Sequence, residues 1–129
     1  MIDATFAQRF AADWIAAWNR HDLDAILAHY ADDFEMVSPL IPQLAGEPSG
    51  RLRGKTRVGA YWARALTPPA LTLSPRLRFE LIGILTGVDS VALHYRSQRG
   101  PAVEVLQFGP DGKVVRAAAH YVPRAQEEP

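Results

Sequence analysis

The chain has no cysteine among its 129 residues, which excludes disulfide scaffolds, thiolate metal sites and cysteine nucleophiles. It has no surplus of either charge, because 14 Lys and Arg balance 14 Asp and Glu. That balance argues against a nucleic-acid partner, since such domains normally carry a basic surplus. The chain also lacks an apolar run near the roughly 18 residues of a membrane span, and a signal-peptide pattern at its N-terminus. We therefore expect a cytoplasmic protein without a membrane partner.

The rest of the composition is typical of a globular protein. The length and the 48% hydrophobic content predict one domain over residues 1–129 with a sizeable core. No repeat or linker divides it, and only residues 124–129 have the composition of a frayed end. The net charge of zero gives weak colloidal repulsion and is compatible with self-association.

Apolar residues recur at helical spacing in the first third of the chain. The first i, i+4 stripe consists of Phe6, Phe10, Trp14 and Trp18, and it predicts a helix ending near residues 19–21. Asp22 is a suitable N-cap for a second helix, whose apolar face extends to Tyr30. Residues 55–66 predict a third helix, which prolines follow.

Strand patterns dominate the second half. A short strand at 33–39 is followed by strands at about 72–85, 89–97, 102–109 and 114–122, with glycine-containing turns between the last ones. Residues 38–53 are rich in proline and glycine and predict an irregular loop, which we expect to act as a lid. Three helices and a strongly curved, mainly antiparallel sheet make an α+β fold, with aromatic stripes buried against the concave face.

Three segments resemble the nuclear transport factor 2-like superfamily: WNRHDLDAILAHYADDFEMVSP, LRGKTRVGAYW and FGPDGKVVRAAAHY. This group includes the SnoaL-like proteins, polyketide cyclases and ketosteroid isomerases, and the resemblance spans roughly residues 6 to 122. It implies a conical barrel with a deep pocket between helices and sheet, and dimerisation through the outer face of the sheet. It implies little about chemistry, because the fold hosts many reactions and many non-enzymes.

Among these families the chain is most similar to the ketosteroid isomerases, whose tyrosine, base and oxyanion-binding acid fall on Trp14, Ser38 and Glu104. Of these three positions, only Glu104 carries the type of residue that the isomerases use, a carboxylic acid. Serine cannot carry a proton as a carboxylate does, so the resemblance does not imply steroid isomerisation. The last strand also lacks the carboxylate that SnoaL-type cyclases place there.

Alternation along the strands predicts which side chains face the pocket. One face of the last strand carries Val115, Ala117, Ala119 and Tyr121, while His120 points outward. In the strand before it, the resemblance puts the face with Glu104 and Leu106 inside.

The strand at 89–97 allows two arrangements. Composition favours burial of its odd-numbered residues Val91, Leu93 and Tyr95. The resemblance instead favours His94 and Arg96 toward the pocket, where an odd number of turn residues would set Glu104 beside one of them. In that case the apolar residues face outward and need a partner subunit.

These positions predict an apolar cavity with one polar cluster of Glu104, His94 and Arg96. We take Glu104, His94 and Tyr121 as candidate catalytic residues; a buried glutamate beside a cation is charged, and without one becomes a proton donor. The candidate lining residues are Trp14, Trp18, Tyr30, Met36, Ser38, Trp62, Arg96, Leu106 and Ala119. A plain aromatic core and a structural ion pair of Glu104 with Arg96 are the simpler alternatives. We expect no metal and no cofactor.

Two classes of function stay open. One is a small acid–base enzyme, an isomerase, cyclase or hydrolase acting on a small apolar carbonyl compound or epoxide. The other is a non-catalytic module that binds a small apolar molecule or serves only for dimerisation. Either is expected to be a homodimer formed through the outer face of the sheet.

Overall fold

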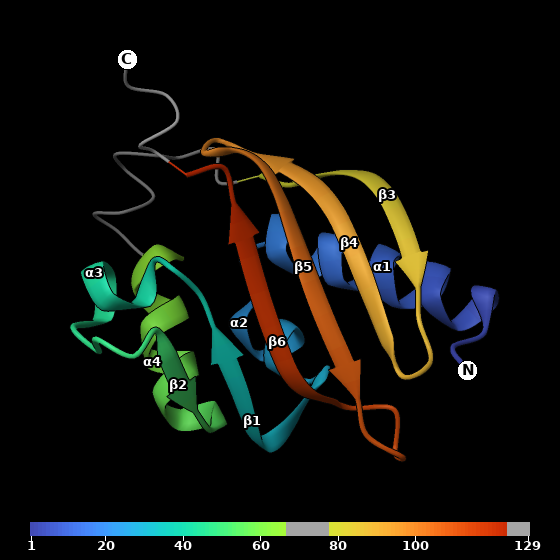
Figure 1. Ribbon diagram of the computed structural model, residues 1–129, viewed down its shortest axis with the longest axis horizontal. Coiled ribbons are helices and arrows are strands. Elements are labelled where there is room, and N and C mark those ends of the chain that lie inside the picture. The colour runs from blue at the N-terminus through green and yellow to red at the C-terminus, as the bar shows by residue number, and fades with distance from the viewer. Residues whose placement is uncertain (67–77, 124–129) are drawn as a thin grey trace.

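Helices alternate with strands in the first half of the chain, and strands follow one another in the second (Figure 1). The computed structural model describes residues 1–66 and 78–123. In these ranges the elements are α1 (Ala4–Asn19), α2 (Leu23–Leu27), β1 (Tyr30–Val37), α3 (Ile41–Ala45), β2 (Arg51–Arg53), α4 (Lys55–Ala65), β3 (Glu80–Thr86), β4 (Ser90–Ser97), β5 (Gly100–Phe108) and β6 (Val114–Tyr121). No helix among these residues is long and apolar enough to cross a membrane.

The strands form one sheet in the order β2-β1-β6-β5-β4-β3. Only β1 and β6 pair in parallel; the other neighbours are antiparallel. The sheet curves, and α1 and α2 lie on one of its faces, with α4 beside β1 and β2 (Figure 1). The predicted α+β cone with a mainly antiparallel sheet is confirmed.

The first helix forms as its periodicity predicts. Asp3 caps it by accepting a hydrogen bond from the Phe6 backbone N–H at 3.2 Å. The apolar stripe turns inward, so that Phe10, Trp14 and Trp18 are buried against the sheet.

The second helix is shorter than predicted. Asp22 caps it through the Ala25 N–H at 3.1 Å, as expected, but the helix ends at Leu27 and Tyr30 begins β1. The reason is tertiary, because the His29 carbonyl accepts a hydrogen bond from Val114 N–H and Tyr30 pairs with β6. Pairing with a strand more than eighty residues later therefore overrides a local helical pattern.

The predicted irregular loop contains two short elements that the proline and glycine content concealed. Ile41 in α3 and Leu52 in β2 are both buried, and their burial orders the segment. Gly46, at φ 74°, ends α3 in the left-handed region that glycine adopts without strain. The role of this segment as a lid stays a prediction.

The turn between β4 and β5 decides which face of β4 points inward. Ser97 pairs with Gly100, so the turn holds two residues and odd positions of β4 lie opposite even positions of β5. Leu93 is therefore the partner of Glu104, and Val91, Leu93 and Tyr95 are buried as composition predicts.

The expected contact of Glu104 with His94 or Arg96 is not made, which corrects the predicted cluster. His94 lies opposite Val103, on the outer face of the sheet, and Arg96 shares that face. The physical reason is the even length of the turn, since a turn longer by one residue would exchange the two faces.

The last strand needs one correction. Ala117 and Ala119 point inward as predicted, but Val115 is exposed and Val114 is buried in its place. The pairing of β5 with β6 shifts register after Gln107, and such a bulge reverses the alternation. The start of the predicted strand at 72–85 lies outside the described residues. The predicted frayed end at 124–129 also lies outside them.

Candidate functional site

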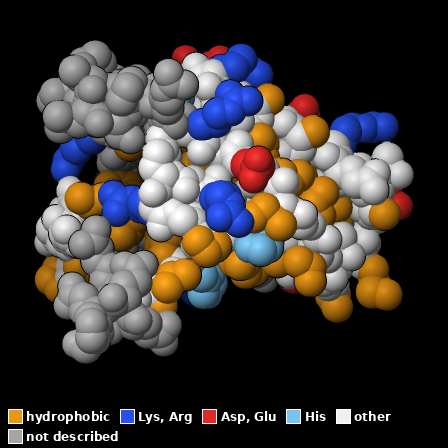
Figure 2. Space-filling model, turned by 90° about the horizontal axis from the view of Figure 1, so that it is seen from above, with side chains coloured by type: hydrophobic (Ala, Val, Ile, Leu, Met, Phe, Trp, Pro, Cys, Tyr) orange, Lys and Arg blue, Asp and Glu red, His pale blue; other side chains and the backbone are white. Residues whose placement is uncertain are grey.

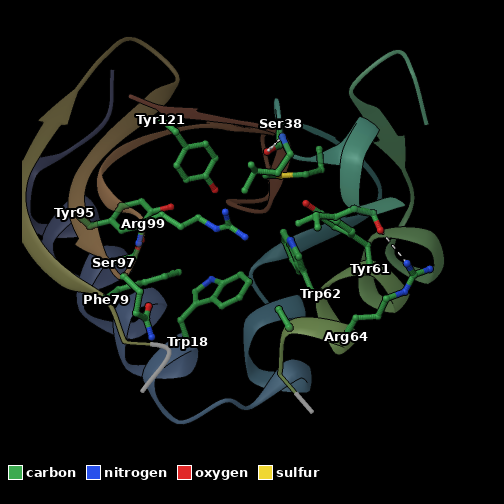
Figure 3. A pocket seen from close by; sticks show the side chains of 15 residues that line it. Trp18, Ser38, Tyr61, Trp62, Arg64, Phe79, Tyr95, Ser97, Arg99 and Tyr121 are labelled. Atoms are coloured by element: carbon green, nitrogen blue, oxygen red, sulfur yellow. Dashed lines mark hydrogen bonds between the residues drawn. The ribbon is translucent and has the colours of Figure 1, made fainter. Parts of the chain in front are cut away.

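A cavity of about 450 Å³ opens between the helices and the inner face of the sheet. Figure 2 looks onto this end of the molecule, where apolar side chains lie in a hollow with Lys and Arg side chains around it. The lining consists of Trp18, Met36, Ser38, Leu40, Leu44, Tyr61, Trp62, Arg64, Ala65, Phe79, Tyr95, Ser97, Gln98, Arg99 and Tyr121 (Figure 3). Its volume and mostly apolar wall suit a small molecule.

Aromatic rings from three parts of the chain form one wall of the cavity. Trp18 of α1 contacts Trp62 of α4 edge-on, with ring centroids 5.2 Å apart, and Phe79 at 5.4 Å. Phe79 is held by the Asn19 side chain, which donates to the Phe79 carbonyl at 3.0 Å and accepts from its N–H at 2.7 Å. This pair of hydrogen bonds links the end of α1 to the start of β3 and thereby fixes the wall.

Two of the expected lining residues lie behind this wall. Trp14 and Tyr30 are each 1% exposed, and the Trp14 Nε1–H donates to the Tyr30 hydroxyl at 2.9 Å. Their polar atoms satisfy each other, so this pair belongs to the core rather than to the cavity.

Glu104 and Tyr95 form the polar centre of the site. Glu104 is only 3% exposed, and the Tyr95 hydroxyl donates to its Oε1 at 3.2 Å. Burial raises the pKa of Glu104 to about 7, although the hydrogen bond from Tyr95 partly opposes this rise. Since Tyr95 lines the cavity and Glu104 does not, the Tyr95 hydroxyl is the group among the described residues that connects the carboxyl group to the cavity.

The negative charge of Glu104 acts on four tyrosine hydroxyls. Burial first, and then the negative charge of Glu104, raises the pKa of Tyr30, Tyr95 and Tyr121. Tyr61 has a raised pKa for the same first reason, partly offset by the positive charge of Arg99 and by a hydrogen bond with Ser38. The hydroxyls of Tyr95 and Tyr121 also influence the pKa of each other. All four hydroxyls therefore stay protonated, and those of Tyr61, Tyr95 and Tyr121, which line the cavity, can donate to a ligand.

Arg99 brings a positive charge to the cavity. It lies in the β4–β5 turn, and Figure 3 shows its guanidinium group extending over the cavity toward the tyrosines. Its charge partly opposes the rise in the pKa of Tyr61 and Tyr121. The second arginine of the lining, Arg64, donates to the Leu44 carbonyl at 3.0 Å.

The structure places the sequence-derived candidates in three locations. Trp18, Met36, Ser38, Trp62 and Tyr121 line the cavity. Trp14, Tyr30, Glu104, Leu106 and Ala119 are buried behind it, and His94 and Arg96 lie on the outer face. Within residues 1–66 and 78–123, no three His, Asp or Glu side chains come together as metal ligands would.

Several cavity residues were not among the candidates, above all Tyr61, Phe79, Tyr95 and Arg99. Tyr95 is the one that the sequence signals, because composition already favours the odd-numbered face of β4 as the inner one. The sequence pattern does not predict that Arg99 faces the cavity, because inward and outward positions alternate only along a strand and Arg99 lies in a turn.

Known proteins resemble the chain over nearly its whole length. A family model described as "SnoaL-like domain" matches residues 11–123. A solved structure of a SnoaL-like protein of unknown function from Burkholderia thailandensis E264 is 61% identical, with a TM-score of 0.86, and the match covers 95% of this chain and 98% of that chain. No curated protein matches the chain.

More distant structures share the fold. A protein of unknown function from Burkholderia xenovorans LB400, described as NTF-2 like, is 24% identical, with a TM-score of 0.65 over 95% of this chain and 92% of that chain. An NTF2-like protein of unknown function from Burkholderia pseudomallei K96243 is 17% identical, with a TM-score of 0.70 over 94% of each chain. At these identities the likeness concerns the fold alone.

Proposed function

Because the chain belongs to the SnoaL-like domain family, we propose that its cavity binds a small, largely apolar molecule and that Tyr95 and Glu104 transfer a proton to it. The observation that carries this proposal is the buried carboxyl group of Glu104, 3.2 Å from a hydroxyl that lines the cavity. Carbonyl compounds and epoxides are the substrates that such a donor activates, as in isomerase, cyclase or hydrolase steps.

The proposed proton transfer follows from the arrangement of three groups: Glu104 is buried, Tyr95 is hydrogen bonded to it, and the ligand lies in the cavity beside Tyr95. When Glu104 is protonated, its O–H can donate to the Tyr95 oxygen, which reverses the hydrogen bond between the two groups and frees the Tyr95 proton for the ligand. The Tyr95 hydroxyl then gives its proton to the ligand oxygen, and Glu104 gives its own proton to the Tyr95 oxygen. The products are a protonated ligand and an ionised carboxylate. Because the pKa of Glu104 is about 7, its proton is present in acid and absent in alkaline solution, and we expect turnover to fall above about pH 7.

A second candidate function is binding without turnover. It is favoured by the lining itself, since no described lining residue is Asp, Glu or His. A site with one indirect proton donor and no second acid–base group can sequester an apolar molecule without converting it.

The test is a thermal-shift screen of small ketones, lactones, epoxides and phenols, followed by turnover assays of each hit. A ligand at 100 times its Kd adds about 2.7 kcal/mol to the free energy of unfolding, which raises Tm by several degrees. We expect Tyr95→Phe to keep the shift and to lower turnover by roughly 100-fold or more. The matched control is Tyr61→Phe, which removes a lining hydroxyl that is not bonded to Glu104.

The outcomes separate the two functions. Equal turnover by Tyr95→Phe and the wild type would contradict the proton transfer. Ligands that bind but are not converted, with affinities unchanged by Tyr95→Phe, would support the non-catalytic function instead. A screen without any shift would count against both.

We also propose a homodimer formed through the outer face of the sheet. The outer face of β4, β5 and β6 carries Ala92, Val103, Val105 and Ala118, and α1 and α2 cover the opposite face (Figure 1). His94, Arg96, Arg116 and His120 share this face, so a second copy of the same face would cover its apolar residues and leave the charged ones to pair with polar groups of the partner.

Sedimentation velocity at micromolar concentration is expected to give twice the monomer mass of 14.2 kDa. Val105→Arg should give a folded monomer, because two guanidinium groups would face each other across the two-fold interface. Val88→Arg is the matched control, since Val88 is 71% exposed in the turn after β3. A monomeric wild type would contradict the proposal.

A further inference from the structure

The indole of Trp18 has a donor that nothing in the described part of the chain accepts. Its Nε1 is buried and has no hydrogen-bond partner among the described residues, while its ring lines the cavity. Trp14, one helical turn earlier, donates to Tyr30 instead. Because buried donors are almost always paired, an unpaired one at a cavity wall points to an acceptor that a ligand supplies.

Arg99 is the second donor group at the same cavity, and its side chain, unlike that of Trp18, is exposed to solvent. It forms no ion pair with any described residue, whereas Arg51, Arg53 and Arg116 all pair with Glu35 on β1. Figure 3 shows the Arg99 guanidinium group extending into the space above the Trp18 ring. A guanidinium group has five donors in a planar fork that matches the two oxygens of a carboxylate.

Resting on the binding function proposed above, we propose that the natural ligand of the cavity is a small aromatic or alicyclic carboxylic acid, whose carboxylate is bound by Arg99 and by the Trp18 Nε1–H. A carboxylate has enough lone pairs to accept both hydrogen bonds of the Arg99 fork and a third from the indole. The apolar body of the acid then lies against Trp62, Met36 and Leu40.

The rest of the lining fits this orientation. Arg64 is the other cation of the lining, but Figure 3 shows its guanidinium group directed away from the centre of the cavity, where one of its N–H groups donates to the Leu44 carbonyl. Tyr95 and Tyr121 supply donors for a second oxygen of the ligand, such as the carbonyl or epoxide oxygen of the proposed substrate. The carboxylate thus anchors the ligand, and the tyrosine hydroxyls act on its other end.

The experiment is isothermal titration of the wild type with a panel of aromatic and alicyclic carboxylates, each paired with its primary amide. The amide keeps the shape and removes the charge. We expect the acids to bind roughly tenfold or more tightly than their amides, because hydrogen bonds to charged groups are the stronger ones. Arg99→Gln should abolish this preference and change amide affinities by less than about twofold.

Two further variants sharpen the test. Trp18→Phe keeps an aromatic ring and removes the donor, so it should weaken the acids several-fold more than the amides. Arg64→Gln removes a lining charge of the same kind and should change neither. Equal affinities of acids and amides, or a preference that survives Arg99→Gln, would overturn the inference.

Failure of this inference differs from failure of the proposed function. Amides and ketones that bind while no acid does would overturn the carboxylate anchor and leave the binding function intact. The absence of any binding in the whole panel would count against both.

Discussion

Replacing Glu104 with Gln is expected to remove a loss of stability that the wild type suffers between about pH 4.5 and pH 7. Burial raises the pKa of this carboxyl from 4.5 to about 7, so in that range the native state holds a proton that the unfolded chain has released. The stabilising contribution is therefore complete below pH 4.5 and is lost as the pH rises through 7. The shift corresponds to about 3 kcal/mol of unfolding free energy.

Urea denaturation of both proteins at pH 4 and pH 8 measures this effect. The wild type should lose about 3 kcal/mol more than Glu104→Gln between the two pH values. The pKa of His29 is lowered, mainly by burial, which acts in the opposite direction, but its effect is common to both proteins and cancels in the difference. Parallel profiles would show that Glu104 ionises in the native state as it does in the unfolded chain.

Replacing Trp14 with Ala is expected to lower the free energy of unfolding by about 3–5 kcal/mol, the cost of a large cavity in a core. Trp14 is 1% exposed and contacts the rings of Trp18, Phe79 and Tyr95 at centroid distances of 6.0, 5.7 and 5.5 Å. Its loss also leaves the Tyr30 hydroxyl without the Nε1–H donor.

Denaturant unfolding measures this loss, and Phe6→Ala is its matched control. Phe6 belongs to the same stripe of α1 but is only partly buried, so its replacement should cost less than half as much. Equal losses for the two variants would contradict the placement of Trp14 in the core. Trp14→Phe should bind ligands as the wild type does, because Trp14 does not line the cavity.

The parts of the fold that local physics decides were predictable. The stripe of α1, the Asp22 cap and the alternating strands β4 and β5 each depend on neighbours a few residues away. The resemblance to the nuclear transport factor 2-like superfamily is also confirmed by the family model and by the structures that share the fold.

The errors lie where distant contacts compete with local patterns. Tyr30 has helical spacing, yet it pairs with β6. Ile41 and Leu52 lie among prolines and glycines, yet burial orders both. In each case a tertiary contact outweighs a local propensity, which is worth only a fraction of a kcal/mol per residue.

The sequence by itself determined the α+β class and the aromatic face of α1, because periodicity records which side of an element is apolar. The inward position of Glu104 was predicted from the resemblance to the ketosteroid isomerases. Only the tertiary structure decided that Tyr95, rather than His94, is the partner of Glu104, since a turn of two residues sets the register. It also decided that Trp14 fills the core while Trp18 lines the cavity. Both tryptophans belong to the same i, i+4 stripe of α1 and carry the same side chain. They differ in their surroundings, because Tyr30 packs against Trp14, whereas the cavity lies beside Trp18.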